Sequence, residues 1–214
     1  MNQEALYKLS YGLFVLTAKE GGKDNGCITN TAIQAASEPN QISVCVNKAN
    51  YTHGMIERTG VFTVSVISQD ATFDLFKHFG FQSGKDIDKF LCFPSCERGD
   101  NGLLFITKGT NAYFSVEVKK AIDLGSHTMF IGEVTDMKVL SDVPSATYAY
   151  YHSSIKPKSE PAVKTKEGKI YWRCKICGYE YIGDELPDDY ICPLCKHPAS
   201  DFEKYNLYVN TVNR

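Results

Sequence analysis

Four cysteines in the last quarter of the chain have the spacing of a metal cage. They form two Cys-x-x-Cys pairs, Cys174 with Cys177 and Cys192 with Cys195. Each pair directs two thiolates toward one point, and two facing pairs make a tetrahedral site of four sulfurs that suits iron or zinc. Because both pairs have the same spacing and lie in one short segment, the sequence predicts a metal site here.

The residues around these cysteines favour iron. Gly178, directly after the first pair, is free to adopt the positive φ that turns backbone N–H groups toward sulfur. Such bonds, together with an apolar shell, tune the potential of an iron–thiolate centre. The aromatic candidates for that shell are Trp172, Tyr179, Tyr181, Tyr190 and Phe202.

Residues 170–203 resemble rubredoxin, and closely the short rubredoxin-like module of rubrerythrins. The resemblance rests on the two cysteine pairs, on Cys-Gly-Tyr after the first, and on Cys-Pro-Leu-Cys in the second. It implies one iron held by four cysteines. Lys196 departs from the family, which usually has glycine after the fourth cysteine. A structural zinc ribbon stays open as the alternative, in which the domain would stabilise the fold without redox chemistry.

Polar residues gather in two segments of the first domain, residues 25–39 and 45–53. With residues 79–90 and 127–134, in the same order, these segments resemble the flavin reductase family of FMN-binding split-barrel dimers. The resemblance covers about residues 1–154 and implies bound FMN and a homodimer. Neither G-x-G-x-x-G nor G-x-x-x-x-G-K-[ST] is found, so a Rossmann dinucleotide site is not expected.

An FMN phosphate needs hydrogen-bond donors and a cation, and the flavin ring needs donors along its pyrimidine edge. Thr31, Lys48, Thr52 and a helix beginning near Asn50 suit the phosphate. By resemblance, the loop of residues 83–86 lies near the flavin, in one reading from the other subunit, and His127 lies near the isoalloxazine or the nicotinamide. The full set assigned to the cofactor is Asn30, Thr31, Gln34, Ala35, Cys45, Asn47, Lys48, Thr52, His53, Ser83, Gly84, Lys85 and His127.

Each of these residues also has a structural interpretation. Threonine and asparagine often cap strand edges and turns. A lysine such as Lys48 is more often a surface residue than a phosphate ligand, and His127 suits a hydrogen-bonded structural role. The ordered set of segments, rather than any one residue, carries the prediction.

The composition excludes several classes of protein. The chain has 214 residues and a formal net charge of −2, without the basic footprint of a nucleic-acid-binding protein. It has no apolar run long enough for a membrane span and no signal-peptide pattern, so we expect a cytoplasmic protein. In that reducing compartment the remaining cysteines, Cys27, Cys45, Cys92 and Cys96, are expected to be free thiols.

The expected fold is mainly β: a split barrel with short helices over residues 1–154, a linker over 155–169, and the metal domain with its tail over 170–214. Strands are predicted at 13–18, 42–46, 61–67, 112–122 and 129–140. Helices are predicted at 3–9, at 50–58 ending before Gly60, and at 71–79 with Asp70 as N-cap. The residues from 155 to 169 are charged and contain two prolines, which is typical of a linker.

The two domains together predict an electron-transfer enzyme that takes a hydride from NADH or NADPH. The fusion resembles the high-molecular-weight rubredoxins, a family that reduces flavodiiron proteins, which remove nitric oxide or oxygen. No catalytic acid or base is expected, because hydride transfer depends on stacking geometry. Residues 170–203 carry seven acidic and three basic side chains, which favours docking to a basic partner or simply forms a solvated face. The alternative function is a flavin or ferric reductase with an accessory metal domain.

Overall fold

The computed structural model describes residues 5, 8–157, 171–175, 179–192 and 198–205. The chain divides into two compact units between Lys156 and Pro157, and each is described by itself. Strands predominate, as the sequence predicted. Among the described residues, no helix has the length and apolar character needed to cross a membrane.

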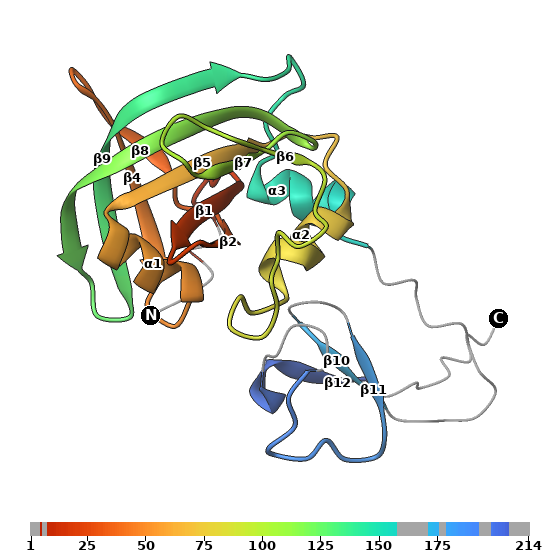
Figure 1. The fold of residues 1–214 in the computed structure, drawn as a ribbon. Coiled ribbons are helices and arrows are strands. Elements are labelled where there is room, and N and C mark those ends of the chain that lie inside the picture. Colours follow the sequence, from red (N-terminus) through yellow and green to blue (C-terminus); the bar gives the residue numbers. More distant parts are fainter. Residues whose placement is uncertain (1–4, 6–7, 158–170, 176–178, 193–197, 206–214) are drawn as a thin grey trace. The chain divides into compact units, whose positions relative to one another are not determined.

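The described residues of the first unit form nine strands and three α-helices; Figure 1 shows their arrangement. The strands are β1 (Phe14–Glu20), β2 (Lys23–Thr29), β3 (Ile33–Ser37), β4 (Asn40–Asn47), β5 (Val61–Ile67), β6 (Cys96–Arg98), β7 (Leu104–Ile106), β8 (Thr110–Asp123) and β9 (His127–Val139). The helices are α1 (Tyr51–Thr59), α2 (Phe73–Gly80) and α3 (Tyr148–Tyr150), which continues into a π-helical turn, Tyr151–Ile155.

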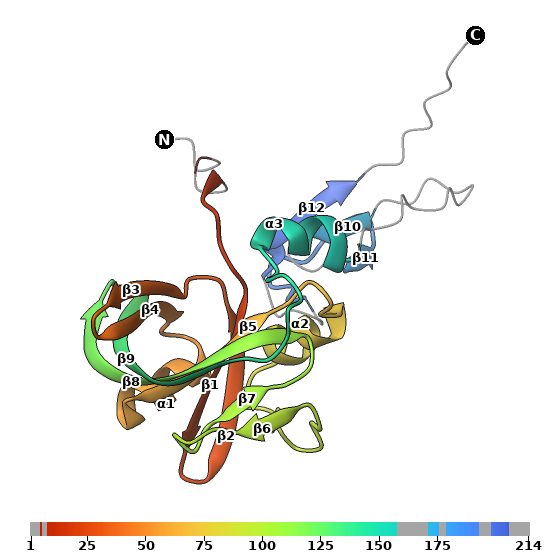
Figure 2. The same cartoon turned by 90° about the horizontal axis from the view of Figure 1, so that it is seen from above.

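Seven strands form one antiparallel sheet in the order β2-β1-β5-β8-β9-β4-β3. Seen from above, β8, β9, β4 and β3 curve round to make one wall, while β1, β2 and β5 lie at the other end (Figure 2). Register shifts between Ser115 and Val116 and between Val118 and Lys120 interrupt the β8–β9 ladder. Such bulges bend a strand and increase its twist, which is what a sheet needs in order to curl toward a barrel.

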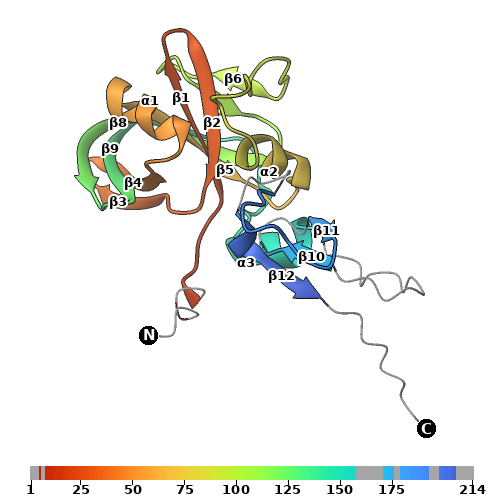
Figure 3. The same ribbon diagram turned by 90° about the horizontal axis from the view of Figure 1, so that it is seen from below.

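The first part of β1 is mostly apolar because both of its faces are covered. Leu16 and Ala18 belong to a core that includes Met55 and Ile56 of α1. Val15, on the opposite face, belongs to a second core with α2. The two helices lie on different sides of the β1–β2 hairpin (Figure 3). An alternating pattern would have exposed one of these faces, so the continuous run is the expected sequence for this strand.

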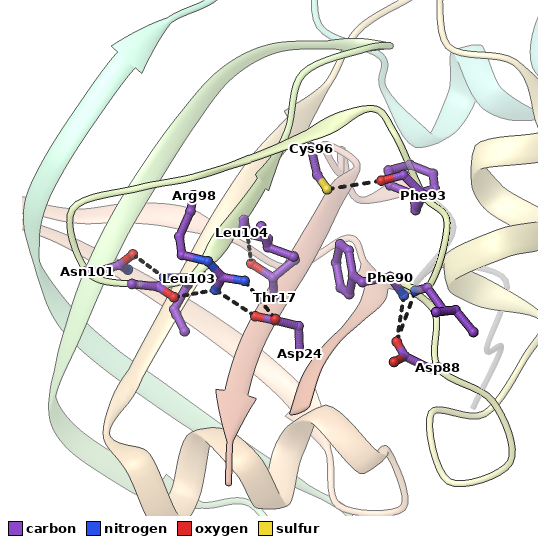
Figure 4. Close-up of polar contacts among 12 residues, drawn as sticks. Thr17, Asp24, Asp88, Phe90, Phe93, Cys96, Arg98, Asn101, Leu103 and Leu104 are labelled. Atoms are coloured by element: carbon purple, nitrogen blue, oxygen red, sulfur yellow. Dashed lines mark hydrogen bonds and ion pairs between the residues drawn. The ribbon is translucent and has the colours of Figure 1, made fainter. Parts of the chain in front are cut away.

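The short strand β7 satisfies buried polar groups on β1 and β5. Thr17 Oγ1 donates to Leu104 O at 2.5 Å, and Ile106 N donates to Ser65 Oγ at 3.0 Å. Arg98 on β6 makes two hydrogen bonds to the carboxylate of Asp24 on β2, at 3.0 and 2.9 Å (Figure 4). The β6–β7 hairpin is thereby fixed across the outside of β1 and β2.

One helix prediction is confirmed closely and another needs correction. α1 has Asn50 as N-cap, whose Oδ1 accepts from Thr52 N at 3.0 Å, and it ends at Gly60 with φ 70°. α2 begins later than predicted, with Thr72 as N-cap, so the assignment of Asp70 was wrong. Asp70 instead accepts a hydrogen bond from Ser68 Oγ. Most of the helix predicted at 3–9 lies outside the described residues.

The second unit contains a three-stranded antiparallel sheet in the order β11-β10-β12. Its strands are β10 (Tyr171–Cys174), β11 (Glu180–Ile182) and β12 (Phe202–Tyr205), with a 3₁₀ turn at Ala199–Asp201. Trp172 pairs with Tyr181 on one side and with Lys204 on the other. β12 is the last described element, and residues 206–214 lie outside the described part.

Candidate functional site

The ends of β4 and β9 bring several predicted cofactor residues together. The register pairs Asn47 with His127, so the last residue of β4 lies beside the first residue of β9. Lys48 follows directly, and its backbone N–H donates to Ser126 O at 3.0 Å. His127 Nδ1 lies 2.8 Å from Ser126 Oγ. Two segments far apart in the sequence therefore present an amide, a lysine and an imidazole where β4 ends and β9 begins.

Helix α1 starts at this same end of β4. Asn50 N donates to Asn47 O at 2.9 Å, so only a tight turn separates β4 from the helix. The first turn of α1 contains no acidic residue. A helix N-terminus carries unpaired N–H groups and a partial positive charge, which favour an anion. With Lys48 adjacent, this donor set fits a phosphate group.

Lys48 already has an anionic partner in the structure. Its Nζ lies 2.6 Å from Asp123 Oδ1, and both side chains are exposed. The Lys48 hydrogen bond and a second one from Gly125 N hold the pKa of Asp123 below its usual value. A phosphate bound by Lys48 would share or replace this contact, and an exposed pair of this kind is cheap to break.

Thr31 lies at the site but is engaged with β4. Its Oγ1 donates to Cys45 O at 2.9 Å and accepts from Cys45 N at 3.2 Å. The hydroxyl thus fixes the segment after β2 to the middle of β4. Asn30 precedes Thr31 and is half-buried in a bend. Cys45 is also partly buried, and this burial raises the pKa of its thiol.

Two predicted ligands, Thr52 and His53, have buried side chains. Thr52 is fully buried and its Oγ1 accepts from Asn25 Nδ2 at 2.8 Å. His53 is also buried, with Nε2 2.8 Å from Thr128 Oγ1 and its ring 5.5 Å from that of Phe130. Their side chains have no free surface for a cofactor. Both residues position the first turn of α1 instead.

Gln34 and Ala35 lie on β3, the edge strand beside β4, and both are exposed. The β3–β4 register shifts between Gln34 and Ala36, which leaves Ala35 opposite no residue of β4. A bulge on an edge strand frees backbone donors and acceptors, and bulges are common beside functional sites. This geometry suits the donors that a flavin ring needs.

The loop of residues 83–85 is fixed to β2 and so to α1. Lys23 Nζ donates to Gly84 O at 2.6 Å. Gly84 packs against the carboxamide of Asn25, which bonds Thr52 at the start of α1. Ser83 and Lys85 are exposed. Asn25 thus links this loop to the helix, and sequence reasoning missed its role although it opens the first polar segment.

A cavity of the barrel unit lies elsewhere. Its volume is about 340 Å³, its lining is mostly apolar, and Gln34 is the only predicted ligand in that lining. An apolar cavity without cations does not suit a phosphate. We therefore place the anion site at the β4–α1 turn and treat the cavity separately.

In the second unit, two of the four predicted metal ligands fall within the described residues. Cys174 and Cys192 have exposed fractions of 1% and 0%. Cys174 N donates to Tyr179 O at 2.9 Å, and Lys175 N donates to Asp201 O at 2.8 Å. Cys177 and Cys195 lie outside the described part, as do Gly178 and Lys196. Two buried thiols in a small domain are a donor set that fits iron or zinc.

The predicted aromatic shell surrounds part of this unit. The Tyr190 ring lies 4.8 Å from that of Tyr181 and 5.4 Å from that of buried Phe202. The Tyr190 hydroxyl bonds that of Tyr179 at 3.5 Å, and this contact together with burial raises the pKa of Tyr190 to about 12. Trp172 Nε1 is buried without a hydrogen-bond partner among the described residues.

Both units match families of known proteins. Residues 6–159 match the flavin reductase like domain, and residues 172–203 match the rubrerythrin, rubredoxin-like domain. The chain is 35% identical to a high molecular weight rubredoxin of Moorella thermoacetica, over 95% of this chain and 100% of that protein. It is 38% identical to a ferric-chelate reductase (NAD(P)H) of Archaeoglobus fulgidus, over 74% of this chain and 94% of that protein. An NADH:FAD oxidoreductase of Streptomyces globisporus shares the fold, with a TM-score of 0.60 at 21% identity, over 68% of this chain and 85% of that one.

Proposed function

Since the chain belongs to the flavin reductase-like family and carries a C-terminal rubredoxin-like domain, we propose that it is an NAD(P)H-dependent electron-transfer oxidoreductase. In this proposal electrons pass from NADH or NADPH, through FMN in the barrel, to one iron held by four cysteines. They then leave to a redox partner such as a flavodiiron NO or O₂ reductase. The observation that carries the proposal is the presence of both domains in one chain, in the arrangement shared with the Moorella protein along its whole length.

The residues of the β4–α1 turn would hold the FMN phosphate. Lys48 supplies the cation, the N-terminus of α1 supplies N–H donors, and Asn47 supplies a carboxamide. The exposed bulge at Gln34 and Ala35 would meet the pyrimidine edge of the ring, and His127 would border it. Bound FMN takes up electrons in pairs and releases them singly, whereas the protein provides binding and orientation.

Cys174, Cys177, Cys192 and Cys195 would hold the iron. The aromatic residues around Tyr190 would exclude water from it, which together with backbone N–H bonds to sulfur sets the potential of such centres. Thiolate ligands favour a reducing compartment, which is why we place the protein in the cytoplasm.

We further propose that the barrel forms a homodimer. Ile33, Met137 and Val139 are between half and about two thirds exposed. Ile33 and Met137 also line the apolar cavity of about 340 Å³. A second copy of the chain would cover this patch, because apolar surface of this kind favours association.

A second candidate is reduction of free flavin or ferric chelates, with the metal domain as an accessory. The similarity to the Archaeoglobus reductase favours it, since 94% of that protein aligns with only 74% of this chain. Loosely held FMN and high activity on added flavin or ferric chelate would support this function over internal transfer.

The decisive experiment mixes the purified full chain with NADH or NADPH anaerobically and follows the flavin and iron absorbance separately. We expect the flavin to bleach first and the iron band to follow. A Cys192→Ser variant should lose iron, retain FMN and still bleach. Bleaching of the flavin with the iron left oxidised would reject internal transfer, and zinc from cells supplied with iron would reject the redox role of the metal.

A further inference from the structure

One lysine of the barrel is buried without an acidic partner. Lys89 has an exposed fraction of 3%. Its Nζ donates to two backbone carbonyls, Gly26 O and Phe79 O, each at 2.8 Å. No ion pair found among the described residues involves Lys89. Burying an ammonium costs free energy unless its hydrogen bonds compensate, so its partners indicate what the charge does.

The first partner is the end of helix α2. Phe79 lies in the last turn, where carbonyl groups have no partner within the helix and carry partial negative charge. Lys89 supplies both a donor and a cation there. The backbone of Lys89 is tied to the same helix, because His78 Nε2 lies 2.6 Å from Lys89 O and must donate to it.

The second partner is strand β2. Gly26 packs so closely on α2 that a Cβ at this position would lie 3.1 Å from two ring carbons of Phe79. Lys89 bonds the carbonyl of this glycine, and therefore joins helix and strand where the two are in close contact. The next turn of the chain is also fixed, since Asp88 Oδ1 accepts from Phe90 N at 2.9 Å and from Leu91 N at 3.2 Å (Figure 4).

These contacts close the loop of residues 81–88 at its base. The loop leaves α2 just after Phe79 and returns to Lys89, so the Lys89–Phe79 bond joins its two ends. Inside the loop, Asp86 N and Ile87 N donate to Ser83 O at 3.1 and 3.2 Å. At its tip, Lys23 holds Gly84 O. The loop that carries Ser83, Gly84 and Lys85 is thus attached to β2 at both base and tip.

We propose that Lys89 is a positioning residue that closes the 81–88 loop and holds it against β2 in the form that binds the flavin. The identity of the ligand, FMN, rests on the proposed function, whereas the closure of the loop by Lys89 does not. The geometry requires a side chain with at least two donors that reaches both carbonyls, which no apolar residue provides. Closing the loop before the cofactor binds lowers the ordering cost of binding.

The test compares Lys89→Met with Lys77→Met in the full chain. Lys77 is an exposed lysine on α2, the helix that Lys89 contacts; it is paired with Asp74 and serves as the matched control. Hydrogen exchange of the apoprotein should speed up at least tenfold at Asp86 and Ile87 in Lys89→Met, with β1 and β5 unchanged. The FMN dissociation constant should rise about tenfold or more, and Lys77→Met should match the wild type in both.

Lys89→Gln, which keeps two N–H donors without the charge, should fall between the wild type and Lys89→Met. If Lys89→Met is too unstable to study, the test uses Lys89→Gln alone. Its hydrogen exchange at Asp86 and Ile87 should then be faster than in the wild type and slower than in an unfolded loop. Unchanged loop exchange in either variant would overturn the proposal, as would equal effects of Lys77→Met. A wild type that does not bind FMN would instead reject the proposed function, while the exchange experiment would still decide the role of Lys89.

Discussion

Replacing Gly84 by alanine should disrupt the contact between the 81–88 loop and β2. A Cβ at this position would overlap Asn25 Oδ1 and lie 2.5 Å from its Cγ and 2.8 Å from its Nδ2. Asn25 has an exposed fraction of 1%, and its Nδ2 bonds Thr52 Oγ1, so the side chain has no open space to enter. Either the loop moves away or the Asn25–Thr52 bond breaks.

The expected cost follows from these two routes. Breaking a buried hydrogen bond and leaving a group unsatisfied costs about 1–3 kcal/mol. Forcing extra volume into a packed site costs about 1–3 kcal/mol. We therefore expect Gly84→Ala to lower the free energy of unfolding of the barrel by about 1–3 kcal/mol, and to weaken FMN binding because the loop carries predicted ligands.

Urea unfolding of the full chain, followed by far-UV circular dichroism, measures this cost. The only tryptophan, Trp172, lies in the second unit, so its fluorescence reports that unit separately and should not change. Gly54→Ala in α1 is the matched control. The nearest atoms to its new Cβ belong to the Arg58 guanidinium, which is flexible and exposed, so this change should be neutral or stabilise by up to about 1 kcal/mol.

A double-mutant cycle tests whether Gly84 and Asn25 are energetically coupled. Asn25→Ala alone should destabilise, because it removes the bond to Thr52. In that background Gly84→Ala should cost less than about 1 kcal/mol, because the overlapping side chain is gone. If the two changes add within about 0.5 kcal/mol, the residues are not coupled and the reasoning is wrong.

Three further predictions test other parts of the barrel. Lys48→Ala should raise the FMN dissociation constant by about 10- to 150-fold, which corresponds to a charge-assisted contact of about 1.5–3 kcal/mol. Asp123→Asn, which frees Lys48, should not raise it. Unchanged flavin affinity in Lys48→Ala would remove Lys48 from the site. Gly132→Ala should destabilise the barrel by about 3 kcal/mol or more in urea unfolding. The new Cβ would overlap a methyl of Val116 and lie 2.6 Å from Glu117 O, a backbone atom that cannot turn away. A loss of stability under about 1 kcal/mol would contradict this. Burial lowers the pKa of Lys89 to about 8 from 10.5, so the unfolded chain binds more protons between these values and stability should rise with pH across that window, by at most about 3 kcal/mol. The rise should be present in the wild type and absent from Lys89→Met, and an equal rise in both would refute the assignment.

Much of the fold was predictable because apolar periodicity and caps are local signals. The predicted strand at 61–67 coincides with β5, and the predicted end of α1 at Gly60 is confirmed by its left-handed conformation. β2 was not predicted as a separate strand. Its sequence, Lys-Asp-Asn-Gly-Cys-Ile-Thr, lacks the β-branched run of a typical strand, and its partners β1 and α2 provide the burial.

The sequence identifies candidate site residues by type but does not show which of them are buried. Thr52 and Lys48 are both polar and lie on either side of the same cap, yet one is fully buried and the other exposed. A single sequence does not show which face of a first helical turn packs inward. The roles of Asn25 and Lys89 depend on contacts with residues distant in the chain, so no local pattern identifies them. The resemblances to the flavin reductase and rubredoxin-like families, in contrast, are confirmed over both domains.

The pairing of Asn47 with His127 has a consequence for how the protein is made. Ribosomes add about 5–20 residues per second, so roughly several seconds separate the synthesis of the two halves of this pair. During that interval β4 has no β9 to pair with, and its edge is open to wrong partners. The cofactor site proposed at this pairing can therefore form only after β9 has emerged, whereas the cysteine-rich unit comes from one short stretch and can fold as soon as that stretch is complete. Insertion of the two cofactors should be separable during synthesis, with chaperone dependence confined to the barrel.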